Sequence, residues 1–577
     1  MTNNIRNIFV IFDKYQKKNF FILIFLMFIS MMLEVLGIAS LIPVINFFLK
    51  NDLIFYKEYI NKISFFNNYS ELKIIYSILI FLTLFFLIKN FYLAFYYWFE
   101  SKIIYKIRLD LGVKLFKGYI NKPYFYHLEN NTSNLLSKII QQTPSFGAVT
   151  MSLANLFSNL ILLTGIFFFL FILRPSETIL MIFVVTFLSI TFFILTKKKI
   201  FNIGKKTEEL EKERVKLLQE SFGAIKEINI HNAQNNFFLI FDKLSNNVAK
   251  ISFIVLFFQK LPKIWFETII VLTTFSLLFY NLFYNSNNER ILITLSVFLI
   301  SSIKILPAAI TIVTSLQTIR FHQNSLMGIL KDLDDNKKNF NGEKILKKRD
   351  IIFKDEIKFF NVSFHYPNSD NFIIKNCNIS IKKNDFICIL GETGSGKSTF
   401  VDLITSLITP THGKILVDGA DICEDQYSWK NKISYVPQHP FLLDASIKEN
   451  IIFQSNQNYV EEKFIDSLNK AELNILIDKL PNGVNSIVGE KGIKISGGEK
   501  QRISIARAIY KESEIIIFDE STNALDLETE KKIMNTIIKF KNIKTVIFVT
   551  HKTNFISIFN RKFDLVNKML KEKEIIS

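Results

Sequence analysis

The side chains best suited to chemistry lie in one glycine-rich stretch, between an apolar run of strand length and a helical pattern. The stretch reads Gly391, Glu392, Thr393, Gly394, Ser395, Gly396, Lys397, Ser398 and Thr399. Its glycines let backbone amides point at a polyphosphate, and the start of a helix adds partial positive charge. Lys397 is expected to bridge the terminal phosphates, and the Ser398 hydroxyl is expected to bind Mg²⁺. Taken alone, the pattern also fits a glycine turn that opens some other helix.

Two carboxylates end a short apolar run farther along the chain. Asp519 and Glu520 follow the four apolar residues 515–518, as expected for a buried strand. Beside a phosphate site, Asp519 would complete the magnesium shell and Glu520 would polarise the water that attacks the γ-phosphoryl group. Paired carboxylates are common at strand ends, so this pattern gains meaning only together with the glycine-rich stretch.

A second group suited to bind an anion opens another helix. Ser496, Gly497 and Gly498 offer a hydroxyl and two glycine amides at this helix start. Two phosphate-binding elements far apart in one chain suggest that two copies of the chain hold the nucleotide between them. His551 follows the strand-like run 545–549 and is a candidate for contact with the γ-phosphate, although a lone histidine after a strand is more often structural.

The N-terminal part of the chain is too apolar for an ordinary soluble protein. The 577 residues are 49% hydrophobic and include 60 phenylalanines, and the mean hydropathy is +0.25. Six apolar runs precede residue 320, and each has about the 20 residues that cross a bilayer as a helix. They lie near 19–49, 72–99, 147–173, 177–196, 264–284 and 291–313. Buried helices of a large soluble core are the alternative.

The distribution of positive charge predicts the orientation in the membrane. The formal net charge is +18, and the long connections at 100–146 and 197–263 are rich in lysine. The links near 174–176 and 285–290 are short and nearly uncharged. By the positive-inside rule, both termini and both long connections lie in the cytoplasm. A basic patch for nucleic acid is the rival explanation of the charge, and the six apolar runs oppose it.

Three regions follow from these patterns. We expect an all-α transmembrane domain of six helices at 1–331, with helices that continue beyond the membrane. A lysine-, aspartate- and asparagine-rich linker is expected at 332–350. Residues 351–577 alternate short strand-like and helical runs, which predicts an α/β domain. Because this domain contains the glycine-rich stretch, we expect a P-loop NTPase domain that binds ATP and Mg²⁺.

Taken together, the motifs resemble the ATP-binding cassette (ABC) family, and the resemblance covers nearly the whole chain. Tyr366 resembles the adenine-stacking aromatic, Gln438 the Q-loop glutamine, Asn523–Asp526 the D-loop, Thr550-His551 the switch histidine, and Val488–Gly492 the exporter-type X-loop. Ile495–Glu499 resembles the signature Leu-Ser-Gly-Gly-Gln, with Ile for Leu and Glu for Gln. The resemblance implies catalytic roles for Glu520 and His551, nucleotide contacts that include Asp526, and magnesium contacts from Ser398, Gln438 and Asp519.

One membrane half fused to one cassette resembles the plan of exporter-type half-transporters. This resemblance implies a homodimer in the cytoplasmic (inner) membrane, with two ATP molecules at the cassette interface. The segments Pro123–Asn131 and Gly223–Asn232 are candidates for the coupling helices that dock on the cassettes.

The cargo is suggested by charges inside the apolar runs. Glu34, Lys89 and Lys304 lie near the middles of the first, second and sixth runs, where a charge costs about 2.5–3.5 kcal/mol. They predict either a basic cavity for an anionic head group such as a pyrophosphate, or pairing between helices in which Glu34 neutralises one lysine. The stretches Leu33–Pro43, Leu261–Lys263 and Lys304–Ala309 resemble those of PglK-type flippases for lipid-linked oligosaccharides.

Other functions fit parts of the same sequence. An exporter of lipids, peptides or drug-like hydrophobic compounds would share every motif above. A soluble cassette ATPase that acts on nucleic acid, or an ATP-gated channel without transport, would also carry the glycine-rich stretch. The six apolar runs oppose the first of these two, and ATP-coupled flux would distinguish the second from a pump.

Overall fold

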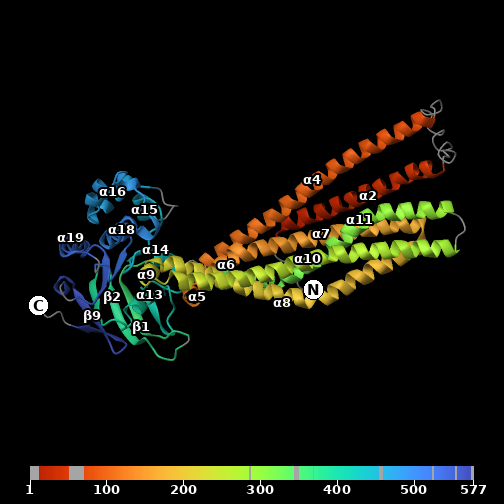
Figure 1. The fold of residues 1–577 in the computed structure, drawn as a ribbon. Coiled ribbons are helices and arrows are strands. Elements are labelled where there is room, and N and C mark those ends of the chain that lie inside the picture. Colours follow the sequence, from red (N-terminus) through yellow and green to blue (C-terminus); the bar gives the residue numbers. More distant parts are fainter. Residues whose placement is uncertain are drawn as a thin grey trace. The chain divides into compact units, whose positions relative to one another are not determined.

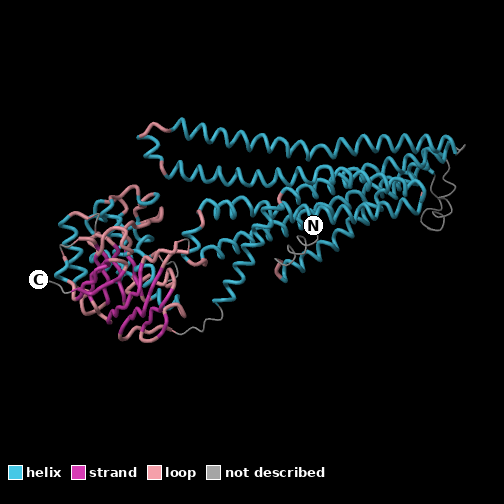
Figure 2. Tube along the Cα trace, turned by 90° about the horizontal axis from the view of Figure 1, so that it is seen from below, coloured by secondary structure: helices cyan, strands magenta, loops and turns pink. Residues whose placement is uncertain are grey.

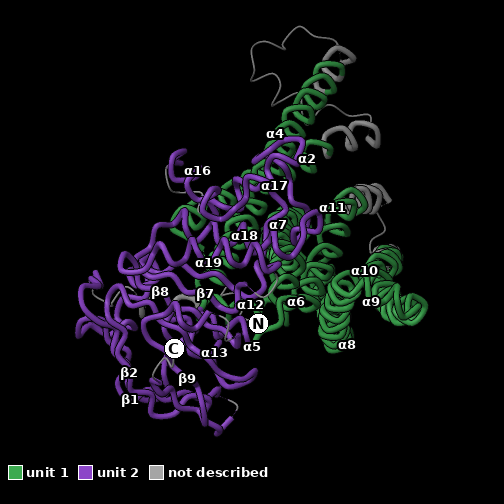
Figure 3. The backbone as a smooth tube through the Cα atoms, turned by 90° about the vertical axis from the view of Figure 1, so that its left-hand side faces the viewer, with its two compact units in different colours: residues 1–122, 129–338 green, residues 123–128, 339–577 purple. Residues whose placement is uncertain are grey.

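The computed structural model describes residues 12–50, 71–284, 288–343, 350–367, 369–453, 459–522, 525–552 and 555–573. Contacts between residues divide the chain into two units, which are coloured separately in Figure 3. Unit 1 comprises residues 1–122 and 129–338, and unit 2 comprises residues 123–128 and 339–577. The contacts of the short segment 123–128 therefore assign it to unit 2, although in the sequence it lies between helices of unit 1.

Unit 1 is built of helices, and six of those in its described residues are longer than 30 residues (Figures 1 and 2). These are α2 (Lys14–Lys50), α4 (Glu71–Ile120), α7 (Thr143–Leu173), α8 (Pro175–Gly223), α10 (Gln234–Tyr284) and α11 (Asn288–Phe321). The six apolar runs of the sequence each coincide with one of them. Pro175 begins α8, where a residue without a backbone amide leaves no helical hydrogen bond unmade.

Five stretches of the described helices are long and apolar enough to cross a membrane. They are Lys14–Leu41, Leu79–Ile120, Thr132–Leu173, Pro175–Gly223 and Leu299–Phe321. The remaining predicted run lies in α10, and several of its side chains fall outside the described residues. With 50 residues, α4 is roughly 75 Å long at 1.5 Å per residue, more than twice the thickness of a hydrocarbon core. Such a helix extends well beyond the membrane.

Short helices join the long ones. They are α5 (Tyr124–Glu129), α6 (Thr132–Ser137), the π-helical turn η2 (Lys138–Gln142), α9 (Ile225–Ile230) and α12 (Gln323–Glu343). The two segments expected to form coupling helices thus contain α5 and α9. Residues 332–343 of the predicted linker form the end of α12, and the rest of that predicted linker lies mostly outside the described residues.

Glycines allow close approaches between the helices of unit 1. A methyl group at Gly165 of α7 would overlap the Met31 side chain of α2, and one at Gly204 of α8 would overlap the carbonyl oxygen of Phe321 at the end of α11. Gly165 lies in the third apolar run, and helices in membranes gain packing energy from such close approaches because lipid is as apolar as leucine.

Unit 2 is an α/β domain with two sheets. An antiparallel sheet has the strand order β2 (Ile374–Lys382), β1 (Glu356–Phe364), β4 (His412–Val417) and β5 (Ala420–Asp421). The second sheet has the order β10 (Met569–Lys573), β9 (Arg561–Val566), β3 (Phe386–Leu390), β8 (Thr545–Thr550), β7 (Ile515–Asp519) and β6 (Ile433–Val436). Its strands pair in parallel except for β10. The expected fold class, a helical transmembrane domain and an α/β nucleotide-binding domain, is confirmed.

The parallel sheet determines where the predicted site residues meet. Strands β3, β7 and β8 are neighbours, and every residue of them is buried, as expected for strands covered on both faces. Since they are parallel, their carboxyl ends lie at one edge of the sheet, the usual ligand edge of such sheets. The glycine-rich stretch, Glu520 and His551 each directly follow one of these strands.

Helices complete unit 2. They are α13 (Lys397–Ile404), α14 (Gln426–Asn431), α15 (Ile447–Ile452), α16 (Glu461–Lys470), α17 (Asn474–Lys479), α18 (Gly497–Tyr510) and α19 (Leu527–Ile538), with the 3-10 turns η3 (Gly483–Asn485), η4 (Glu490–Gly492) and η5 (Ile556–Ile558). One core cluster includes Phe359 and Phe400, and a second includes Phe386 and Ile503, so apolar residues cover both faces of the parallel sheet.

The contact at Gly204 yields a stability prediction. Gly204→Ala is expected to destabilise unit 1 by about 1–3 kcal/mol, because the added methyl group overlaps backbone and must push α8 from α11. Thermal melting of the full chain in detergent measures this change. Gly223→Ala is the matched control, because no atom lies within 4 Å of a methyl group built there. Equal melting temperatures for the two variants would contradict the close approach.

Candidate functional site

The glycine-rich stretch forms a loop between β3 and α13. Gly394 and Gly396 have φ angles of +83° and +110°, in the region that favours glycine. A methyl group at Gly391 would lie 2.6 Å from the Ser395 hydroxyl, so the turn has no room for a side chain there. Gly396 precedes the first turn of α13 and provides no capping side chain. The first amides of α13 therefore remain available to an anion.

Lys397 lies beneath this loop. Its side chain is only 7% exposed. Its ammonium group donates hydrogen bonds to the carbonyl oxygens of Gly391 at 2.8 Å and Glu392 at 3.1 Å. It also lies 3.2 Å from Oε1 of Glu520. The lysine predicted to bridge phosphates is thus held by the loop and by the predicted catalytic carboxylate.

Glu520 brings the predicted residues together. Its φ angle of +45° is uncommon for a residue with a side chain and marks a sharp turn after β7. Its Oε2 accepts a hydrogen bond of 2.8 Å from Nε2 of Gln438, and its Oε1 lies 3.5 Å from Nδ1 of His551. The phosphate loop, the segment after β6, the end of β7 and the end of β8 therefore meet at one carboxylate.

Asp519 is the buried last residue of β7. Burial raises the pKa of its carboxyl group and the nearby Glu520 adds to the rise, while a hydrogen bond of 3.1 Å donated by the Tyr435 hydroxyl opposes it. A buried carboxylate with this shift is stabilised by an added cation. Ser398, whose side chain is exposed, and Gln438 supply further oxygen atoms. An all-oxygen donor set fits Mg²⁺.

Ser496, predicted to bind a phosphate, lies exposed at the start of α18. Its hydroxyl accepts a hydrogen bond of 3.3 Å from the amide of Glu499, and the Glu499 carboxylate accepts one of 2.7 Å from the amide of Ser496. This is a capping box, which glutamate and glutamine form equally well. Glu499 in place of the family's glutamine therefore preserves the helix start, including the backbone of Gly497 and Gly498.

The remaining residues predicted to contact the nucleotide lie elsewhere in unit 2. The ring of Tyr366 packs edge-on against Phe364 at 5.1 Å and stacks on Phe125 of α5 at 6.4 Å between centroids. Asp526 caps α19 by accepting a hydrogen bond of 3.0 Å from the amide of Thr529. The predicted D-loop residues 523–524 lie outside the described residues. Thr393 is exposed, whereas Thr399 is buried at the start of α13.

In unit 1, Glu34 meets both lysines. Its Oε2 lies 3.1 Å from Nζ of Lys89, and its Oε1 lies 2.9 Å from Nζ of Lys304. One carboxylate thus contacts two ammonium groups, which is the arrangement of paired charges that the sequence offered as one of two alternatives. The three residues come from α2, α4 and α11, and the cluster retains one net positive charge.

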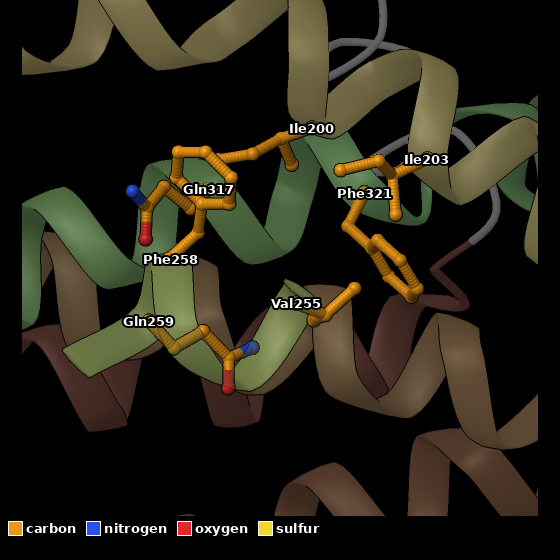
Figure 4. Close-up of a pocket in the computed structure, with 7 residues that line it drawn as sticks. All are labelled: Ile200, Ile203, Val255, Phe258, Gln259, Gln317 and Phe321. Carbon is orange, nitrogen blue, oxygen red and sulfur yellow. The ribbon is translucent and has the colours of Figure 1, made fainter. Parts of the chain in front are cut away.

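A cavity elsewhere in unit 1 is too small for a substrate (Figure 4). It lies between α8, α10 and α11 and has a volume of ≈ 10 Å³, room for about one water molecule. Its lining residues are Ile200, Ile203, Val255, Phe258, Gln259, Gln317 and Phe321. The buried amide group of Gln317 has no hydrogen-bond partner among the described residues, and one water molecule there would satisfy it.

Three residues near the site were not predicted from the sequence. Gln501 of α18 is buried and donates a hydrogen bond of 2.6 Å to the carbonyl oxygen of Gln438, which ties the signature helix to the Q-loop. Tyr435 contacts Asp519, and Asp402 lies on α13. Burial raises the pKa of the Asp402 carboxyl group to about 6, with a further rise from Asp519. Of these three residues, only Tyr435 could have been found from the sequence, because it is a polar residue three positions before Gln438.

Comparison with known proteins gives the same division of the chain. Residues 13–309 match the ABC transporter transmembrane region, and residues 374–523 match the ABC transporter family. An ATP-dependent lipid A-core flippase of Wigglesworthia glossinidia brevipalpis is 27% identical over 488 residues, 83% of this chain and 80% of the relative.

Two further matches differ in extent. An alpha-hemolysin translocation ATP-binding protein of Escherichia coli O157:H7 is 39% identical over 227 residues, which cover 38% of this chain and only 32% of that relative. A solved structure of a bacterial Atm1-family ABC exporter with ATP bound has a TM-score of 0.76 and 19% identity, over 94% of this chain and 93% of that chain. At this identity the second match shows a shared fold.

The raised pKa of Asp402 yields a pH-dependent prediction. The pKa of the Asp402 carboxyl group is about 6 in the folded protein and 3.8 ordinarily, so between these pH values the folded state binds more protons than the unfolded state. The free energy of unfolding therefore falls as the pH rises from about 4 to about 6. Asp402→Asn removes this loss, so its melting temperature should exceed that of the wild type above pH 6 and approach it near pH 4. Asp370→Asn, at an exposed position, is the control. A stabilisation that does not change with pH would contradict the assigned cause.

Proposed function

The chain belongs to the ABC transporter family as an exporter-type half-transporter, and on this premise we propose that it flips a lipid-linked oligosaccharide, or a similar polyprenyl-pyrophosphate glycan, across the cytoplasmic membrane. ATP hydrolysis drives the transport. The observation that supports the substrate class is the cluster of Glu34, Lys89 and Lys304, which retains positive charge inside three membrane-spanning helices. An anionic head group on a lipid matches this charge. Export of another lipid, a peptide or a drug-like compound is the second candidate.

A likeness over most of the chain supports a lipid substrate. The relative that matches 83% of this chain is named as a lipid A-core flippase. Charged groups inside a hydrocarbon core are costly and face protein or a water-filled path. A lysine that faces a water-filled path would attract a negatively charged cargo as the cargo moves along that path.

In the proposed hydrolytic site, Glu520 orients and polarises the attacking water and His551 contacts the γ-phosphoryl group. Lys397 neutralises the terminal phosphates, and the amides of the glycine-rich loop hold them. Ser398, Gln438 and Asp519 would hold Mg²⁺, which when bound would supply positive charge against the phosphates. Tyr366 stacks on adenine. Because Glu520 contacts Lys397 and Gln438 in this structure, nucleotide binding must separate these partners before the carboxylate can act on water.

A second identical chain completes the proposed site. Ser496, Gly497 and Gly498 of one copy contact the nucleotide held by the loop of the other, and Asp526 lies at the interface. Exposed apolar side chains in and next to α9 support the proposed second chain. Phe222, Ile225 and Ile230 are large, apolar and exposed. A cassette of the partner chain covers this surface in the dimer. No nucleic acid takes part.

The proposed orientation places both termini in the cytoplasm, where ATP is present. Segments α5 and α9 then lie at the ends of helices that extend beyond the membrane, at the positions of coupling helices. The contact of Phe125 in α5 with Tyr366 supports a role for α5 in sensing the nucleotide.

Glu520→Gln tests the assigned base. The change keeps the shape of the side chain but removes its charge, so ATP hydrolysis should fall at least about 100-fold while ATP binding persists. Phosphate release and binding of a fluorescent ATP analogue measure the two properties. Near-normal turnover would contradict the assignment.

The matched control is Glu499→Gln, the same chemical change at a residue whose carboxylate caps α18. This variant should hydrolyse ATP. With ATP bound, the Glu520→Gln protein is also expected to be dimeric by mass measurement, and a monomer under these conditions would rule out the shared site.

Replacing both intramembrane lysines tests the substrate class. Lys89→Ala combined with Lys304→Ala should bring the ratio of lipid-stimulated to unstimulated ATPase activity close to one, because the anionic head group loses its cations. The measurement uses liposomes with a polyprenyl-pyrophosphate glycan and, for comparison, a neutral polyprenol. Lys263→Ala, an exposed lysine paired with Glu267 on α10, is the control. Equal loss of both rates would indicate a structural role for the two lysines.

A further inference from the structure

The ion cluster of unit 1 joins three helices through a single side chain. Glu34 of α2 is 9% exposed, and each of its carboxylate oxygens contacts a different lysine. Oε2 connects α2 to Lys89 of α4, and Oε1 connects α2 to Lys304 of α11. If the ion pair between Glu34 and one lysine breaks, the ion pair with the other lysine can therefore remain intact.

The two lysines differ in what surrounds them. The Lys89 side chain is 4% exposed. Its ammonium group lies 4.5 Å from the centroid of the Phe86 ring, and a methyl group at Gly37 would approach it to 3.6 Å. Lys89 is thus enclosed by protein on several sides.

Lys304 is accessible from outside the cluster. Its side chain is 39% exposed although its ammonium group contacts Glu34. A ligand can therefore reach Lys304 without moving the groups that enclose Lys89. Of these two lysines, Lys304 is the one that an arriving anion meets first.

The charges favour an exchange at Lys304. A phosphate or pyrophosphate group carries more negative charge than one carboxylate and offers more acceptor oxygens to an ammonium group. After the exchange, Glu34 keeps Lys89 as a neutral buried pair, so no charge is left without a partner. Breaking the Lys89 contact instead would leave an enclosed ammonium group unpaired, which is costly.

We propose that Glu34 is a built-in substitute for the anionic head group of the substrate. In the resting chain it occupies Lys304 and ties α2 to α11, and the head group replaces it there. This inference rests on the proposed function, which brings an anionic lipid to the cluster. It adds that the substrate competes with a residue of the protein itself, so substrate binding removes the ion pair between α2 and α11 while the ion pair between α2 and α4 remains.

This exchange gives the substrate a direct effect on the helices. The tie that it breaks holds α11, which continues in sequence into α12 and from there toward unit 2. A neutral lipid of the same length cannot make the exchange, because nothing in it replaces the carboxylate on Lys304.

The test measures binding of farnesyl pyrophosphate to the full-length protein in lipid nanodiscs. Glu34→Gln preserves the size of the side chain but removes the competing charge, so the dissociation constant should fall at least about fivefold. Lys304→Gln should abolish charge-dependent binding, and adding Glu34→Gln to it should produce no gain.

A second pair of variants separates competition from structural damage. In Lys89→Gln, Glu34 has only Lys304 as a partner, so the probe should bind more weakly than to the wild type although Lys89 is enclosed. Adding Glu34→Gln to Lys89→Gln should restore binding to at least the wild-type level. A structural role for the cluster predicts a further loss in the double variant, and that result would overturn the inference.

Three probes identify the ligand class. Farnesol should bind equally to the wild type and to Glu34→Gln, and inorganic pyrophosphate should bind more weakly than farnesyl pyrophosphate with the same order among the variants. If inorganic pyrophosphate binds as tightly, the exchange at Glu34 stands but a lipid is not the ligand.

The remaining outcomes separate the two proposals. If wild-type binding depends on Lys304 but Glu34→Gln binds no more tightly, the inference fails and the proposed substrate class stands. If farnesyl pyrophosphate binds the wild type no better than farnesol does, the proposed substrate class fails and the inference fails with it.

Discussion

Two largely buried carboxylates of this protein each need a cation beside them, and meeting this requirement connects elements within both units. In unit 1, Glu34 lies between Lys89 and Lys304 and so connects α2 to both α4 and α11 within the membrane-spanning region. In unit 2, Glu520 lies against Lys397 and so connects the end of β7 to the phosphate loop. An isolated buried charge would cost several kcal/mol, and breaking one partner of such a pair costs nearly as much.

The same requirement makes both sites responsive to anions. Lys397 and Lys304 each contact a carboxylate of the protein in this structure, and each is proposed to bind a phosphate group of a ligand. Ligand binding then begins as an exchange of partners rather than as the filling of an open pocket. In the proposed exchanges, Glu520 would become able to act on water, and Glu34 would no longer pair with Lys304 of α11. Energy from nucleotide binding and from substrate binding would thus reach the helices by the same kind of step.

The sequence was enough to predict which site residues meet, because parallel strands place their carboxyl ends at the same edge of a sheet. Motifs that follow β3, β7 and β8 had to meet once these runs were recognised as strands of one sheet, although about 160 residues separate the glycine-rich loop from His551. The contacts of Gln501 and Tyr435 were not recoverable in this way. Each depends on which side chains of α18, β6 and β7 face one another, and glutamine and tyrosine occur at many positions where they contact only water. The pairing of Glu34 was also undecided, because a sequence does not show whether a carboxylate serves one lysine or two.

The sequence by itself determined the division into an apolar helical part and an α/β part, the glycine-rich loop before a helix, the candidate catalytic carboxylate Glu520 and the membership in a family of transporters. These depend on local order: hydrophobic runs long enough to cross a bilayer, and glycines that must lie between a strand and a helix. Only the tertiary structure decided that α12 extends to Glu343 within the expected linker, that Glu520 lies between Lys397, Gln438 and His551, and that Glu34 contacts two lysines that differ in exposure. The physical reason is that exposure and charge pairing arise from neighbours distant in the chain, which packing alone brings together.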